Sequence, residues 1–531
     1  MTRAAPEAAR GRLRFRRVEQ PRWLIVPLAV TLAVLAVLIA LATPGAHVLG
    51  AVLAYANLVL IGAAAVYFVQ QRTLQGLIPV LFLVWFAAGW PLPTIYFATL
   101  FPKAVYHTFA DQREFLFGAV RVQAVALVFL VAYLGTVLLV AGRYPPWTFA
   151  AASQSTDRRV GGAVLWIVMA AITLHAASQI VTLPGPLMYI ASGSYNYLHG
   201  LMLMVGVLFL RLPVQTRFRA LVFMALAGAF YLIGNARGLA VLPATLFVVG
   251  LIFLSEIKQR YKTWTVIAAC AGLPLALVIG NTTRTLMGSI GFTEFGARLS
   301  ALGQWQEVLS RTPVLAATFH RLFFVGGHSI IAFSPEYFPY LEFSPARYGW
   351  ELLTRLLPGK LFYEPYYSTN ARLQQYGFLI TEETSYPMSL LGSLYMLGGV
   401  VPVILGACAI AGFHSLLSRL IGLANRRSRH LGLFIFSMMA STLIWSQNVD
   451  LITNVRVTAW RVLSAFVLYG ALLRPLAERP AGQRRLVRPG RGASPWWRAP
   501  RPPSAQLDAG ELVAGTSGTK WGPSFRWTPR A

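Results

Sequence analysis

The residues best suited to chemistry lie in one long polar stretch, from Asn281 to Pro387. The candidates within it are Arg284, Arg298, His320, Arg321, Glu382 and Glu383. A guanidinium group binds anionic oxygen atoms through two parallel hydrogen bonds. A carboxylate or an imidazole can accept the proton of a reacting hydroxyl group. The stretch therefore supplies groups that hold an anion and groups that act as a general base.

The composition indicates the class of protein to which this polar stretch belongs. The chain has 531 residues, of which 56% are hydrophobic and only 12% are charged, and its mean hydropathy is +0.58. A soluble domain has about 25% charged residues, so the sequence predicts an all-α polytopic membrane protein. The net charge of +28 lies in short loops and tails between apolar runs. That placement orients helices in a membrane and argues against nucleic-acid binding.

Apolar runs of about the ~20 residues that a bilayer requires recur along the chain. They predict about twelve transmembrane helices, near 23–42, 48–69, 76–100, 122–141, 161–183, 196–211, 219–235, 238–255, 264–280, 388–417, 431–447 and 457–473. Every second connection is rich in arginine or lysine, so both termini are expected in the cytoplasm. The large, partly helical loop between the ninth and tenth spans then faces outward.

This topology predicts five parts of the chain. They are a basic cytoplasmic tail (1–22), helices one to nine (23–280), the outer loop (281–387), helices ten to twelve (388–475) and a disordered cytoplasmic tail (476–531). Both cysteines, Cys270 and Cys408, fall in apolar runs. Neither a disulfide framework nor a metal site is therefore expected.

Some arginines break the positive-inside rule, and their position on the outer side makes them informative. Arg237 lies in a turn between two apolar runs that are shorter than a full crossing, and Arg461 lies near the start of the last span. Such arginines are costly unless they meet an anion or a partner. Headgroup snorkelling of Arg237 and an ion pair between Arg461 and Asp450 are the alternative explanations. His175, alone in the fifth span, is expected to be a helix-packing residue.

Three segments resemble one family in their order and placement. They are GNARGLA at 234–240, ARL at 297–299 with Trp305 and RTP at 311–313, and TSYP at 384–387 leading into LGSLYMLGGV at 391–400. Together they resemble the O-antigen ligase and polymerase superfamily over roughly residues 220–415. The ligases of that superfamily carry a histidine-asparagine pair before the returning helix. This chain has Thr384, Ser385 and Tyr386 there, which favours a repeat-unit polymerase (Wzy type).

The resemblance implies a glycosyltransferase that polymerises undecaprenyl-pyrophosphate-linked oligosaccharide units at the outer face of a bacterial plasma membrane. Its partners would be the lipid-linked oligosaccharide, membrane lipids, and other assembly proteins such as a flippase and a chain-length regulator. No metal or other cofactor is implied. Arg237 and Arg298, followed by Arg284, Arg321 and Arg461, would bind the pyrophosphate. Glu382, Glu383 or His320 would act as the base, although the two glutamates could instead favour a helix N-terminus as a solvated charge pair.

Other functions remain open at the level of the sequence. A ligase-like glycan transferase would share the fold and most of the motifs. A flippase or exporter of the same lipid-linked sugars should carry charges along a path through the bilayer, whereas here the charges gather on one side. A lipid-phosphosugar transferase would need an acidic pair in the first outer loop, which reads only TPGAH at 43–47. Peptidoglycan-type polymerisation would need an acidic catalytic residue in the large loop.

Overall fold

Apolar segments in lipid must satisfy their backbone hydrogen bonds internally, and helices do so. The computed structural model describes residues 46–71, 74–95, 112–141, 154–181, 198–233, 237–255, 261–269, 389–445 and 451–477, with isolated positions such as Phe333. All regular structure in these ranges is helical, which confirms the predicted all-α class there. Contacts divide the chain into Met1–Arg479 and Pro480–Ala531, and the described residues belong to the first unit.

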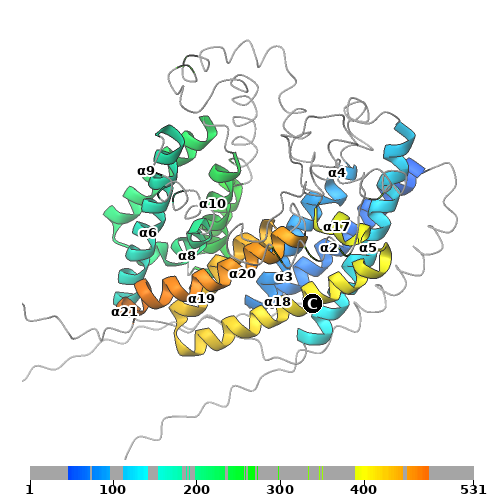
Figure 1. Ribbon diagram of the computed structural model, residues 1–531. Coiled ribbons are helices and arrows are strands. Elements are labelled where there is room, and N and C mark those ends of the chain that lie inside the picture. Colours follow the sequence, from blue (N-terminus) through cyan, green and yellow to red (C-terminus); the bar gives the residue numbers. More distant parts are fainter. Residues whose placement is uncertain are drawn as a thin grey trace, which may run out of the picture. The chain divides into compact units, whose positions relative to one another are not determined.

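The helices follow the apolar runs of the sequence (Figure 1). They are α2 (Ala46–Gln70), α3 (Leu74–Gly89), α4 (Pro91–Ile95), α5 (Gln112–Ala141), α6 (Gln154–Ile180), η3 (His199–Leu201), α8 (Met202–Leu208), η4 (Phe209–Arg211), α9 (Val214–Ile233), α10 (Arg237–Val249), η5 (Gly250–Leu254), α17 (Leu390–Met396), α18 (Val400–Arg427), α19 (Arg429–Trp445), α20 (Leu451–Leu468), η9 (Tyr469–Leu473) and α21 (Arg474–Ala477). Residues 261–269 are also helical.

Five of the described helices are long and apolar enough to cross a membrane. They are Leu49–Gln70, Gly76–Ile95, Val120–Val140, Gln154–Ile180 and Val400–Arg427. The other apolar segments, among them His199–Arg211 and Arg429–Ile444, are shorter. The predicted first span, 23–42, lies outside the described residues. The total of about twelve spans and the outer loop therefore stay predictions.

Two hydrophobic clusters hold the helices together, and both draw on α3 and α18. One cluster joins α2, α3 and α5 to α17 and the first half of α18, through residues such as Phe82, Phe129 and Val403. The other joins α6, α8, α9, α10 and α19 to the second half of α18, where Leu417 and Ile421 are buried. Because α3 and α18 supply side chains to both clusters, they connect the two groups of helices.

Glycines let two of these helices cross at close range. A Cβ atom added at Gly206 of α8 would collide with the carbonyl of Phe247, and one added at Gly250 would collide with the carbonyl of Leu203. The backbones of α8 and of the α10–η5 helix therefore touch. Small residues at a crossing point allow this packing in membranes, where no hydrophobic force drives helices together.

The sequence predicts one continuous helix over 388–417, and the structure has two helices there. Helix α17 ends at Met396, and a turn with positive φ at Gly398 (154°) and Gly399 (76°) separates it from α18. Glycine adopts such angles without the clash that a Cβ atom would cause. Ser389, also at positive φ, caps α17 by accepting a hydrogen bond from Gly392 N.

Helix α9 begins before its apolar run. The sequence predicts that the apolar run over 220–234 is too short to cross the membrane, and α9, which starts at Val214 and has 20 residues, is not among the helices that are long and apolar enough to do so. The apolar pattern stops at Arg217 and Arg219, yet arginine is a good helix former and continues the helix.

A buried ion pair ties α6 to α19. Asp157, in the first turn of α6, is fully buried and accepts hydrogen bonds from Arg429 Nη1 and His430 Nε2, each at 2.8 Å. Both partners open α19. In the predicted orientation this contact lies at the cytoplasmic end of the two helices. A buried carboxylate needs such partners, because its desolvation is costly.

Candidate functional site

Arg461 is a predicted site residue whose side chain lies inside the described part of the chain. It is about three turns from the start of α20 and only 4% exposed. Ala465 and Tyr469 follow it at four and eight residues and are also buried. Residues at this spacing share one face of a helix, and α20 packs against α19. The helical repeat thus brings a cationic side chain into the core.

The guanidinium of Arg461 is oriented by a hydroxyl group. Its Nη1 donates to Thr442 Oγ1 at 2.6 Å. Thr442 lies in the last turn of α19, close to Trp445, where that helix ends. Because side chains lean toward the N-terminus of their helix, Arg461 reaches back toward the start of α20 and meets the end of α19. These ends lie on the side that the sequence predicts to face outward.

Further polar side chains are buried around the same part of α19. Gly200 of η3 lies against the carbonyl of Ser437, and a Cβ atom there would come within 3.2 Å of Ser441 Oγ. His199, next in sequence to Gly200, is buried too, as are both serines. We refer to His199, Ser437, Ser441, Thr442 and Arg461 as the α19 polar cluster.

Helix α10 brings a second predicted arginine to this group of helices. Arg237 is the first residue of α10, and α10 contacts both η3 and α19. The predicted turn thus leads into a helix that contacts two elements of the cluster, although the side chain of Arg237 lies outside the described part of the structure.

The other predicted site residues fall outside the described ranges. They are Glu382, Glu383, His320, Arg284, Arg298 and Arg321. Their proposed roles stay predictions. Among the described residues, no group of three or more His, Cys, Asp or Glu side chains is placed to hold a metal ion.

Phe333 is one of the described positions of the predicted outer loop, and it contacts α5, α17 and the residue between α3 and α4. The carbonyl of Phe333 accepts a hydrogen bond from Arg121 Nη1 of α5 at 2.9 Å. Its ring meets Trp90 edge-on, with 5.8 Å between centroids, and stacks on Tyr395 of α17 at 5.0 Å. We call this the Phe333 contact. It gives Arg121 of α5 a carbonyl of the predicted outer loop as partner.

A buried amide network supports the helix ends beneath Phe333. Asn57 Nδ2 donates to Gln123 Oε1 at 2.9 Å, and Gln123 Nε2 donates to Thr94 Oγ1 at 2.7 Å and to the Trp90 carbonyl at 3.0 Å. The network joins α2, α4 and α5. A further bond, from Leu451 N to Ser393 Oγ at 3.3 Å, joins α17 to the start of α20. The Phe333 contact and the helix that carries Arg461 therefore share α17 as a neighbour.

His175 supports the packing interpretation made from the sequence. It is buried in α6, and its Nδ1 lies 2.9 Å from Tyr231 Oη of α9. Tyr231 Oη also lies 3.3 Å from the carbonyl of Ile172. The pair links α6 to α9.

The sequence interpretation missed His199, Ser441 and Thr442. A weak signal was present, because Ser437, Ser441 and Thr442 are polar positions four and five residues apart within the apolar run of α19. Residues at this spacing share one side of a helix. Which helix they would meet depended on tertiary packing, which spacing alone does not reveal.

Comparisons with known proteins find no relative of this chain. No family model matches the chain, and neither a curated protein nor a solved structure matches it. The function is therefore argued from the α19 polar cluster and from the family resemblance of the sequence.

Proposed function

We propose that the protein is a membrane glycosyltransferase that polymerises undecaprenyl-pyrophosphate-linked oligosaccharide units at the outer face of a bacterial plasma membrane. The observation that carries this proposal is Arg461, buried in α20 with its guanidinium directed toward Thr442. An ionisable side chain within a membrane helix usually serves function. An arginine in the outer half of the predicted last span is suited to a pyrophosphate, because its guanidinium binds phosphate oxygens through two hydrogen bonds.

The reaction transfers a growing glycan from its lipid carrier to the next unit. A sugar hydroxyl of the incoming unit attacks the anomeric carbon of the chain, the bond from that carbon to the pyrophosphate oxygen breaks, and undecaprenyl pyrophosphate leaves. The leaving group gains negative charge as the bond breaks. Arg461 and Arg237 stabilise that charge in this proposal, because preorganised cations act most strongly in a site of low dielectric. Arg298, Arg284 and Arg321 contribute further cations from the loop.

A base must take the proton of the attacking hydroxyl group. Glu383 and Glu382 are the preferred candidates, and His320 is the third. The two glutamates lie seven and eight residues before the start of α17, and α17 contacts α20. The proposal uses arginines instead of a metal ion for the leaving group.

A flippase or exporter of the same lipid-linked sugars is the second candidate. The observation that favours it is the buried Asp157 with Arg429 and His430, which adds charge at the other end of the helix bundle. A transporter requires polar groups at more than one depth. We favour the enzyme because both carboxylate oxygens of Asp157 already accept hydrogen bonds, one from Arg429 and one from His430.

Deletion of the gene, followed by electrophoresis of the surface polysaccharide, separates these functions. A polymerase predicts that single repeat units accumulate on the cell surface. A flippase predicts that no lipid-linked material reaches the outer face. A ligase-like transferase predicts full-length polymer that stays on its lipid carrier. Either of the last two results would reject the proposal.

Complementation with variants then tests the site. Arg461→Ala should reduce polymer by about 10²-fold, as removal of one preorganised donor does elsewhere. Arg461→Lys should restore only part of it, because lysine lacks the planar fork. Arg427→Ala removes an exposed arginine from the end of α18 and serves as the control. Normal chain length with Arg461→Ala would exclude Arg461 from the site.

A further inference from the structure

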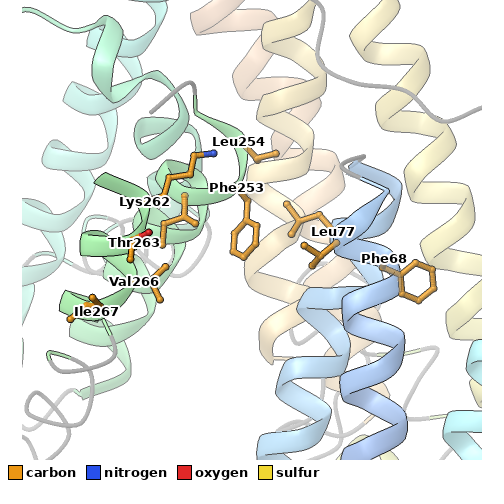
Figure 2. A pocket seen from close by; sticks show the side chains of 10 residues that line it. Phe68, Leu77, Phe253, Leu254, Lys262, Thr263, Val266 and Ile267 are labelled. Carbon is orange, nitrogen blue, oxygen red and sulfur yellow. The ribbon is translucent and has the colours of Figure 1, made fainter. Parts of the chain in front are cut away.

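A pocket of about 570 Å³ lies between α2, α3, η5 and the helical segment 261–269. Its walls include Phe68, Leu77, Phe253, Leu254 and Val266. Figure 2 shows side chains of the 261–269 segment on one side, Phe253 and Leu254 in the middle, and Leu77 on the other side. The pocket is thus largely apolar, and none of its lining residues belongs to the α19 polar cluster.

Lys262 supplies a cation to this apolar pocket. It lines the cavity and is partly exposed, and in Figure 2 its amine extends toward Leu254. Its side chain makes no ion pair with any residue in the described ranges. Lysine can lay its methylene stem along apolar surface and keep its ammonium group at a polar boundary. The pocket therefore combines an apolar wall with one available positive charge.

We propose that this pocket binds one anionic phospholipid, with an acyl chain against the apolar wall and the phosphate on Lys262. The volume falls within the roughly 300–1,000 Å³ of small-molecule sites. Charge and polarity favour this occupant: a free phosphate would leave the apolar wall uncovered, and a neutral lipid would bring no negative charge to Lys262. The site does not depend on glycosyl transfer.

The position of the pocket indicates which leaflet supplies the lipid. Phe68 lies at the end of α2 and Leu77 near the start of α3, on either side of the connection at Arg72. In the predicted orientation that connection is cytoplasmic. Basic residues next to the cytoplasmic leaflet attract its anionic lipids. The expected ligand is therefore a lipid of the inner leaflet.

Native mass spectrometry of the full-length protein in detergent tests this site. The protein is titrated with dioleoyl phosphatidylglycerol or, for comparison, with neutral dioleoyl phosphatidylcholine. The wild-type protein should retain one phosphatidylglycerol in preference to phosphatidylcholine. Lys262→Gln should weaken phosphatidylglycerol binding about five-fold, the effect of one lysine near a charged lipid, and should leave phosphatidylcholine unaffected. Val266→Trp, which fills the cavity, should weaken both lipids.

Lys258→Gln is the matched control. It removes the same charge four residues earlier, from an exposed lysine that does not line the pocket. Equal losses with Lys258→Gln and Lys262→Gln would show diffuse surface attraction and overturn the proposal. So would equal retention of the two lipids by the wild-type protein. Lys262 is partly exposed, so the Lys262→Gln protein should elute as the wild-type protein does. Its lipid binding then tests the proposal even where Val266→Trp fails to fold.

Discussion

Arg461 differs from the other arginines of this chain in what surrounds its charged group. Most arginines here lie in loops and tails, where water and headgroups solvate them. Arg461 is buried between helices and donates to a threonine hydroxyl. A hydrogen bond that involves a charged group is shorter and stronger than a neutral one. Thr442 therefore holds one nitrogen of the guanidinium group.

Replacing Thr442 tests the role of this hydrogen bond. Thr442→Val removes the acceptor for Arg461 Nη1, so polymer formation should fall about ten-fold, the factor that corresponds to a hydrogen bond of about 1.5 kcal/mol. Thr442→Ser keeps the hydroxyl group and should retain most of the activity. The measurement is chain length in a complemented deletion strain, with protein level checked by immunoblot. Equal activity of the two variants would mean that the hydroxyl does not orient Arg461.

The sequence predicts Arg461 as a site residue but does not predict Thr442. Arg461 is conspicuous because it follows the outer connection, where arginine is rare. Thr442 is not, because threonine is tolerated in any membrane helix and its role depends on the rotation of α19 against α20. Asp450, the partner suggested by proximity in sequence, lies outside the described residues.

Helix packing in this protein depends on residues that lack side chains. At the crossing of α8 with the α10–η5 helix, Gly206 and Gly250 each face a backbone carbonyl of the other helix. No larger residue fits without separating the two helices. The crossing also positions η3, which belongs to the α19 polar cluster and directly precedes α8.

A single added methyl group tests the crossing. Gly250→Ala should destabilise the protein by about 1–3 kcal/mol, the usual cost of overpacking, and should lower the midpoint of thermal unfolding in detergent. Gly228→Ala is the control, since a Cβ atom at that position of α9 meets nothing within 4 Å. The close crossing would be refuted by a Gly250→Ala protein that unfolds at the temperature of the wild type while Gly228→Ala behaves as expected.

The apolar runs of the sequence predict where helices occur, but they do not predict the residues at which the helices begin and end. Each run from the second predicted span onward overlaps a described helix. The ends of α9 and α17 differ because they depend on local effects. Helix α9 begins before the apolar run because arginine is compatible with a helix. The turn at Gly398 and Gly399 separates α17 from α18, although the hydropathy of this run is continuously high.

At the scale of the whole molecule, the Phe333 contact joins the predicted outer loop to the helices. Phe333 is fully buried against Trp90 and Tyr395. The sequence placed the loop next to the outer ends of the spans but offered no means to choose Phe333 among its many aromatic residues.

Limited proteolysis tests whether Phe333 anchors the loop. Phe333→Ala removes a buried ring, a change that usually costs about 3–5 kcal/mol, so cleavage within 281–387 should become at least about ten-fold faster. Trp350→Ala is the matched control, because Trp350 belongs to the same loop but is 64% exposed. Identical cleavage rates for the two variants would show that the loop is held elsewhere.

The shared position of α18 has a consequence for synthesis of the chain. Tyr133 of α5 hydrogen-bonds to His414 of α18 at 2.7 Å, across 281 residues of sequence. At ~5–20 residues per second, translation needs roughly 15–55 s to cover that distance. During that time α5 is in the membrane without its main late partner, and its buried tyrosine faces lipid or another protein. Helix α18 is therefore added to helices that were synthesised well before it. A chaperone or insertase that shields α5 in the interval would act before either hydrophobic cluster is complete.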